Sequence, residues 1–315
     1  QYGRANGMMS LVEMGPGVIA PLLAGALLPL IGLTGVMAID VAPFLVAIGA
    51  LLVVHIPQPP RTEEGRRAAQ GSLLQDAIYG FRYIFSRPSL LGLQMTFFFG
   101  NLFAGVGGTL LAPMLLARTG NNETALGVVL SAGAIGGVAG GVLMSAWGGF
   151  KRRVHGVLLG WIWSGLFGLI LLGLGRDLTM WAVFTFLGVL PFAIMNGSNQ
   201  AIYQAKVPPD VQGRVFAARR LIAWLNSPLT PLLGGVTADF VLGPAMLQGG
   251  SLTGVFGGLV GTGPGAGMAL LMIGCGVLSA LVGIGGYFVP VVRNAEALLP
   301  DHDAAPAAAP AAAGD

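Results

Sequence analysis

Long runs of apolar residues, each near the length of a membrane-spanning helix, dominate this sequence. A helix needs about 20 mostly apolar residues to cross the hydrocarbon core of a bilayer. The runs show no alternation of period 2, which argues against membrane-spanning β-strands. Eight stretches qualify, namely 7–30, 35–56, 90–117, 124–147, 154–175, 178–205, 221–243 and 266–292. We therefore predict an all-α, polytopic membrane protein with eight transmembrane helices in this sequence.

Composition supports a lipid environment. Of the 315 residues, 54% are hydrophobic and only 9% are charged, whereas about 25% of an average soluble domain is charged. A net charge of +3 is too small to indicate a nucleic-acid partner. The two lysines, Lys151 and Lys206, do not follow the glycine of a phosphate-binding loop, and no metal-ligand or nucleophile–base pattern is present. We expect no enzyme, no cofactor and no metal.

Basic residues predict the sidedness, because Lys and Arg stay on the cytoplasmic side of a membrane. Fourteen of the sixteen fall on one side of the eight predicted helices, and only Arg118 and Arg176 fall on the other. Both ends of the sequence are then cytoplasmic. Within the charged segment 58–88, apolar residues at 74, 77, 78, 81, 84 and 85 predict an amphipathic helix on the cytoplasmic membrane face. The Ala/Pro-rich tail over 294–315 is expected to be disordered.

An internal repeat organises the chain. Residues 3–25 and 213–235 align without a gap at an offset of 210, with seven identities in 23 positions. This offset spans six predicted helices, so the first helix of the sequence is the counterpart of the seventh. A parallel repeat of two six-helix halves follows, with twelve helices in all. Four of the twelve are expected upstream of Gln1, which would make this sequence a fragment truncated at its N-terminus.

Four stretches carry a resemblance to a known family, namely 3–7, 77–84, 147–153 and 206–216. Together they resemble the major facilitator superfamily, and within it the branch of macrolide efflux proteins and the enterobactin exporter. The resemblance implies that 1–57 holds the last two helices of an N-terminal six-helix bundle, 58–88 is the cytoplasmic linker and 89–293 is the C-terminal bundle. It also implies a monomer in the bacterial inner membrane that exports a small molecule, usually driven by proton entry.

Glu13 is the candidate for proton coupling. An ionisable group inside the bilayer costs about 2.5–3.5 kcal/mol, so it normally faces a cavity or a partner. The alternative is that Glu13 lies near the inner end of its helix and pairs with Arg4. Around it, a glycine–proline pattern resembles the antiporter signature of drug exporters and predicts a bend; its residues are Gly15, Pro16, Pro21 and Gly25. The alternative here is an ordinary kinked packing helix.

Polar side chains in the later helices are candidates for the substrate path. Asn196, Asn199, Gln200 and Tyr203 share one helix face by their spacing, and Gln94 and Asn101 share another. Asn226 is a weaker third. The alternative role for all of them is hydrogen bonding between helices. No Lys or Arg lies inside a predicted span, which predicts a polar but uncharged path. Small residues repeat every four positions in the predicted helix 124–147 and are expected to pack helices closely, namely Gly133, Gly137 and Gly141, and likewise Gly136 and Gly140.

A basic cluster between two predicted helices matches the position of the superfamily's cytoplasmic motif, although the acidic residue of that motif is missing. Its residues are Lys151, Arg152 and Arg153, and Arg214 is grouped with them. The resemblance implies a cytoplasmic lock for one conformation; the alternative is topology anchoring alone. The sequence thus favours a proton-driven exporter of an amphipathic drug or siderophore. An uncoupled facilitator or importer, and a non-transporting scaffold or receptor, remain the alternatives.

Overall fold

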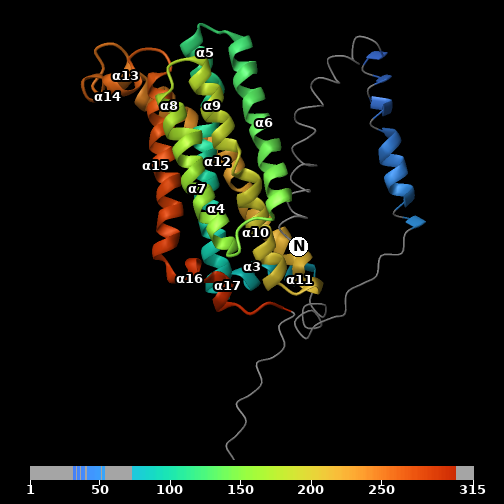
Figure 1. The fold of residues 1–315 in the computed structure, drawn as a ribbon. Coiled ribbons are helices and arrows are strands. Elements are labelled where there is room, and N and C mark those ends of the chain that lie inside the picture. The colour runs from blue at the N-terminus through green and yellow to red at the C-terminus, as the bar shows by residue number, and fades with distance from the viewer. Residues whose placement is uncertain are drawn as a thin grey trace, which may run out of the picture.

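The computed structural model describes residues 31–32, 34–35, 37–39, 41–50, 52–53 and 73–302. From residue 73 onward, every regular element that it describes is a helix (Figure 1). The first half comprises α3 (Leu73–Phe85), α4 (Pro88–Thr109), α5 (Leu111–Thr119), α6 (Glu123–Trp147), α7 (Arg153–Gly165), η1 (Leu166–Leu171), α8 (Leu172–Leu174) and α9 (Leu178–Val189). The second half comprises α10 (Phe192–Lys206), α11 (Pro209–Trp224), α12 (Asn226–Val236), η2 (Thr237–Leu242), α13 (Gly243–Met246), α14 (Thr253–Val260), α15 (Ala266–Phe288), α16 (Pro290–Arg293) and α17 (Ala295–Leu298).

Consecutive helices join into six segments that are long and apolar enough to cross a membrane. Within the described residues these are Pro88–Thr119, Glu123–Trp147, Arg153–Leu174, Leu178–Lys206, Pro209–Met246 and Ala266–Phe288. They confirm the last six of the eight predicted helices. The first predicted helix, over 7–30, lies outside the described residues. The described pieces of the second, over 35–56, are helical. The total of eight stays a prediction.

The helix boundaries have local causes in the sequence. The side-chain oxygen of Asn122 accepts a hydrogen bond from the Ala125 amide and begins α6, and that of Asp177 accepts from Met180 and begins α9. Pro88 and Pro209 occupy the first turns of α4 and α11, where a missing amide hydrogen costs nothing. Gly148 ends α6 with a φ of 84°, a left-handed conformation that glycine adopts without strain.

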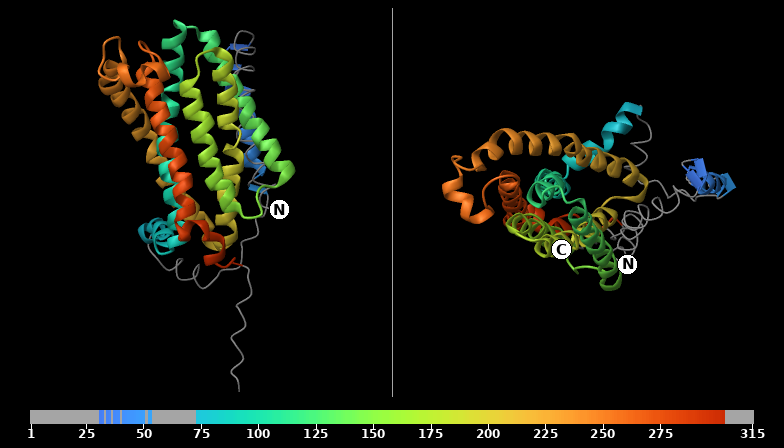
Figure 2. Two further views of the ribbon diagram at one scale, coloured as in Figure 1. Left: turned by 60° about the vertical axis from the view of Figure 1, so that its left-hand side comes forward. Right: turned by 90° about the horizontal axis from the view of Figure 1, so that it is seen from above.

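The spans lie side by side with their loops at two opposite ends (Figures 1 and 2). At one end lie α3, α11, α16 and α17, together with the loop before α7; we call this the basic end. Of the twelve Lys and Arg residues that the structure describes, all but Arg118 and Arg176 belong to these elements or to the adjoining helix ends. The described Lys and Arg residues therefore divide between the two ends of the bundle as the sequence predicted. Which face of the membrane the basic end occupies stays a prediction.

Close helix packing depends on small residues. A Cβ atom at Gly136 or Gly140 of α6 would collide with the carbonyl oxygens of Phe186 and Leu190. The predicted packing role of these two glycines is therefore confirmed. Around the bundle, α4 packs against α12 and α15, and α7 packs against α15 and α10. Buried apolar side chains form one cluster around Trp161 and Tyr203 toward the basic end and a second around Trp181 and Met272 toward the opposite end.

Helix α3 lies where helical spacing predicted it, and part of its surface is buried against the bundle; its contact with the membrane face stays a prediction. The apolar set of the prediction included residues 78, 81, 84 and 85. The structure buries Gly80, Tyr83 and Ile84, with α3 packed against α11 and α4, and leaves Ile78 and Phe85 exposed. A Cβ at Gly80 would collide with the carbonyl oxygen of Arg214 in α11. The backbone contact at this glycine therefore decides which face of α3 meets the bundle.

The C-terminal segment follows the bundle further than expected. The sequence predicted a disordered tail from residue 294, but the structure has α17 over Ala295–Leu298. The Glu296 carboxylate accepts a hydrogen bond from the Val154 amide at the start of α7, and the His302 amide donates to the carbonyl of Ala205. These two contacts attach the segment to the basic end. Residues from 303 onward lie outside the described part of the chain.

Candidate functional site

The polar face predicted on α10 is divided by packing. Asn199 and Tyr203 are buried, whereas Asn196 and Gln200 are half-buried. The Asn196 side-chain amide donates to the Phe192 carbonyl of its own helix, at 2.9 Å. The Tyr203 hydroxyl donates to the Leu90 carbonyl of α4, at 2.8 Å. Tyr203 therefore joins two helices, which was the alternative role, and Asn196 leaves its carbonyl oxygen for other partners.

Arg219 of α11 completes a cluster with Gln200 and Tyr203. Its guanidinium carbon lies 3.7 Å from the centroid of the Tyr203 ring, and Nη1 donates to the Gln200 side-chain oxygen at 3.0 Å. The centroid of the Phe216 ring lies 5.4 Å from the same guanidinium carbon. The Nε atom of Arg219 is buried and has no hydrogen-bond partner among the described residues. A cation held by an aromatic face and an amide, without a carboxylate, keeps much of its electrostatic attraction for a further group.

Arg219 is a residue that sequence reasoning left out of the candidate path. The path was expected to be uncharged, which stays a prediction, and the relevant span was predicted to begin at 221. The observed helix begins earlier, at Pro209, and Arg219 lies in its first part, α11, at the basic end. A signal for this was available: Val211, Val215, Ala218 and Ile222 recur at helical spacing, and all four are buried. Arg219 adjoins that buried stripe.

The α4 candidates lie at different depths. Gln94 is buried in the bundle, and Asn101 is half-buried, with its amide donating to the Phe97 carbonyl at 2.7 Å. Asn226 of α12 donates to the Phe98 carbonyl at 3.0 Å, so it joins α12 to α4. Among the described residues, no group donates to the buried Oδ1 atoms of Asn199 and Asn226. Buried acceptors of this kind are available to a ligand or to water.

The cytoplasmic-motif candidates gather at the basic end. Lys151 and Arg152 are exposed, and Arg153 donates to the Ala201 carbonyl of α10 at 3.2 Å. The Arg214 guanidinium lies 5.8 Å from the ring centroid of Tyr79 in α3. Arg153 therefore connects α7 to α10, and Arg214 connects α11 to α3. These contacts would have to change if the basic end opened.

Lys206 is a second residue that sequence reasoning missed. It was counted only as a topology marker, yet its side chain is 6% exposed. Its ammonium group lies 2.7 Å from the Asp301 carboxylate and donates to the carbonyls of Glu296 and Leu299. No local pattern could show this, because the partners lie about ninety residues away in sequence. Lys206 holds the C-terminal segment across the basic end.

Five predicted site residues lie outside the described part of the chain. They are Glu13, Gly15, Pro16, Pro21 and Gly25. The repeat segment 3–25 lies there too, so its equivalence to 213–235 stays a prediction. Within the described residues, no group of three or more His, Cys, Asp or Glu side chains could hold a metal ion.

Comparison with known families decides the identity of this helical bundle. A model described as the Major Facilitator Superfamily matches residues 1–231, well over half of the chain. The chain belongs to the Major Facilitator Superfamily. A search of curated proteins and a search of solved structures each gave no match.

Members of the Major Facilitator Superfamily are membrane transporters, and the described geometry is of that kind. Six apolar spans surround polar groups contributed by α4, α10, α11 and α12. In this member of the Major Facilitator Superfamily, the candidate polar groups described above include amides, a phenol and a guanidinium. Such groups can bind and orient a small molecule by hydrogen bonds and a single positive charge.

Proposed function

We propose that the full-length protein is a secondary active transporter that exports an amphipathic small molecule across the bacterial inner membrane, in exchange for protons. The substrate would bind near the midplane between two six-helix bundles, and rocking of the bundles would open the site to one side at a time. The cluster of Arg219, Gln200 and Tyr203 carries this proposal, because it supplies hydrogen-bonding groups and a positive charge at the basic end of the described bundle, where a substrate would enter the site.

The middle of α4 offers groups that suit an amphipathic substrate. Asn101 lies on the same helix as Phe98, Phe99 and Phe103, whose rings contact one another, and Phe99 is exposed. Amides among aromatic rings offer a few oriented hydrogen bonds on an apolar wall. A macrolide-like drug or a siderophore has surfaces of both kinds. These are the substrates handled by the branch of the superfamily that the sequence resembles.

Proton coupling is assigned to Glu13. Support comes from the described spans, in which the acidic residues lie toward helix ends: Glu123 begins α6, Asp210 is in the first turn of α11, and Asp239 is exposed in η2. None of these is placed like Glu13, which stands seven residues into an apolar run. The bend predicted from Gly15, Pro16, Pro21 and Gly25 would let the helix that carries Glu13 rock.

The proposal is tested by flux in proteoliposomes that contain the full-length protein. An imposed proton gradient is expected to drive uphill transport of a fluorescent amphipathic dye or a macrolide. Glu13→Gln is expected to abolish the gradient-driven component while passive exchange of substrate continues. If uphill transport is unchanged in Glu13→Gln, the coupling assignment is wrong. If wild type equilibrates substrate but never concentrates it, the protein is an uncoupled facilitator.

A second measurement separates a transporter from a scaffold. Gln200→Ala removes the amide that accepts from Arg219, and its matched control, Gln248→Ala, removes an exposed amide near the opposite end. We expect weaker substrate binding and slower flux in the first variant only. No flux of any compound in a broad panel, with normal folding, would favour a non-transporting scaffold or receptor. Light scattering of the purified protein would test the expected monomer.

A further inference from the structure

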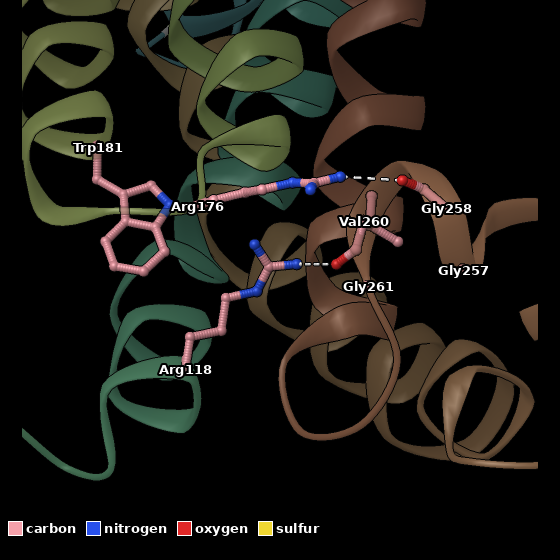
Figure 3. Close-up of a pocket in the computed structure, with 7 residues that line it drawn as sticks. All are labelled: Arg118, Arg176, Trp181, Gly257, Gly258, Val260 and Gly261. Atoms are coloured by element: carbon pink, nitrogen blue, oxygen red, sulfur yellow. Dashed lines mark hydrogen bonds between the residues drawn. The ribbon is translucent and has the colours of Figure 1, made fainter.

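A cavity of about 500 Å³ lies at the end of the bundle opposite the basic end. Its wall includes Arg118 at the end of α5, Arg176 in the turn before α9, Trp181 of α9 and the glycine-rich end of α14 (Figure 3). Both arginine side chains reach toward α14. These are the two basic residues that the sequence places apart from all the others, so their meeting in one cavity calls for a physical reason.

Neutral backbone groups supply the hydrogen-bond partners of the two guanidinium groups. Arg118 donates to the carbonyl of Gly175 at 3.0 Å and to that of Val260 at 2.6 Å. Arg176 donates to the carbonyl of Gly258 at 2.9 Å. Within the part of the chain that the structure describes, no carboxylate lies within ion-pair distance of either arginine. Two positive charges therefore face one cavity without a negative group to offset them.

Asp177, the acidic residue nearest in sequence, does not offset the two arginine charges. Asp177 follows Arg176 directly in sequence, but its side-chain oxygen accepts from the Met180 amide and caps α9. The indole N–H of Trp181 donates to the Gly175 carbonyl at 3.0 Å, so the indole presents an apolar surface to the cavity. An anion that offsets these charges would therefore come from outside the described residues.

Donors remain available for such an anion. A guanidinium group has five N–H donors in a planar fork that fits carboxylate and phosphate oxygens. Arg118 uses two of its nitrogens and Arg176 uses one in the contacts described above. We propose that this cavity binds an oxyanion of the phosphate type between Arg118 and Arg176. The group is either a free phosphate-bearing solute or the phosphodiester of an anionic lipid.

Sidedness makes the cavity distinctive. Charge-assisted hydrogen bonds to an oxyanion are roughly twice as strong as neutral ones, and basic residues are otherwise retained on the cytoplasmic side. A site for a phosphate group at the opposite end would account for the presence of two arginines there. The bonds that they make to carbonyl oxygens need a donor but no charge, so fold maintenance alone does not explain the charges.

The proposal is tested with the purified full-length protein and three variants. Arg176→Gln keeps a side-chain donor for the Gly258 carbonyl but removes the charge. Arg118→Gln likewise keeps a donor and removes the charge at the half-buried arginine. Arg82→Gln removes an exposed charge at the basic end and is the control. Thermal unfolding is followed in detergent during titration with inorganic phosphate. In parallel, native mass spectrometry follows the retention of phosphatidylglycerol against phosphatidylcholine in mixed micelles.

We expect one of the two anions to bind saturably to wild type and to Arg82→Gln. The apparent affinity should fall about tenfold or more in Arg176→Gln, as expected for the loss of a charged donor. Stabilisation by inorganic phosphate identifies a site for a free solute, and selective retention of phosphatidylglycerol identifies a lipid site. The proposal is overturned if neither anion binds, or if Arg176→Gln binds as wild type does. Arg176→Gln decides the matter even if Arg118→Gln fails to fold.

Discussion

The two ends of the bundle use basic residues in different ways. At the basic end, Arg219 lies on the ring of Tyr203, Arg214 lies near the ring of Tyr79, and Lys206 pairs with Asp301. At the opposite end, Arg118 and Arg176 meet backbone carbonyls and share one cavity. The number of basic residues marks the sidedness, but their partners determine what each end can do.

The basic residues differ in what their charged groups do: those at the basic end join parts of the chain, and those at the opposite end keep unused hydrogen-bond donors. The charges at the basic end tie together helices and segments far apart in sequence, so a conformational change there must exchange one set of partners for another. The two charges at the opposite end are held by neutral groups and keep donors in reserve. The basic end is therefore suited to holding one conformation, and the opposite end is suited to holding an anion.

The largest loss of stability is expected for Lys206→Met at the basic end. Removing one partner of a buried ion pair costs about 3–5 kcal/mol when the remaining charge is left buried. Because Asp301 is 52% exposed, its charge is left in water, and we expect less, about 2–3 kcal/mol. Two carbonyls would also lose their donor, so the C-terminal segment should become sensitive to limited proteolysis. Unfolding in mixed micelles with added SDS measures the loss. The exposed Lys151→Met is the matched control, and equal stability of the two variants would contradict the assignment.

A smaller loss is expected where the linker helix meets α11. Gly80→Ala would place a Cβ against the Arg214 carbonyl, and overpacking of this kind costs about 1–3 kcal/mol. Gly213→Ala in α11 is the control, because a Cβ there meets nothing within 4 Å. The same unfolding assay compares them. If Gly80→Ala is as stable as Gly213→Ala, α3 does not belong to the basic end in the way described here.

At the opposite end, the two arginines should differ from each other. Arg118 is half-buried and holds two distant carbonyls, so Arg118→Gln should cost about 1–2 kcal/mol. Arg176 is exposed, and Arg176→Gln should change stability by less than about 0.5 kcal/mol. Unfolding is measured without added phosphate and in a zwitterionic detergent. A loss at Arg176 as large as that at Arg118 would show that both residues are structural.

The fold was largely predictable because its main determinant is local. A span such as Leu178–Lys206 was predicted to within one residue, since apolar length alone defines it. The helix that begins at Pro209 was predicted only from residue 221 onward, because its first turns contain Asp210, Arg214 and Arg219 and are too polar to be recognised by apolar length. The helical spacing of the apolar residues in those turns would have indicated that the helix begins earlier.

The candidate site was less predictable because burial depends on neighbours. Spacing placed Asn196 and Tyr203 on one face of α10, yet packing within the bundle buries Tyr203 and leaves Asn196 half-buried. The partners of Lys206, and the shared cavity of Arg118 and Arg176, join residues that are distant in sequence. Helical periodicity gives the direction of a side chain around its own helix, but it does not say which other helix will be there.

The smallest effect on stability, and a large one on function, is expected for Arg219. Its side chain is half-buried with Nε out of contact with water, and it has an aromatic ring and one amide for partners and no carboxylate among the described residues. Replacing a buried charge by an apolar group of similar volume is often neutral or stabilising. A residue that served only the fold would therefore gain little from being arginine at this position.

Arg219→Met should accordingly unfold within about 0.5 kcal/mol of wild type, or later. Under the proposed function, it should slow substrate flux in proteoliposomes about tenfold or more, the change expected when a charged recognition group is lost. The neighbouring Arg220→Met removes an exposed arginine that lies 5.0 Å from the ring centroid of Trp224, and it should keep most of the flux. Loss of stability without loss of flux would assign Arg219 to the scaffold. Loss of flux with stability retained would place Arg219 in the substrate path. The basic end would then both join segments of the chain and bind a ligand, and in binding a ligand it would resemble the opposite end.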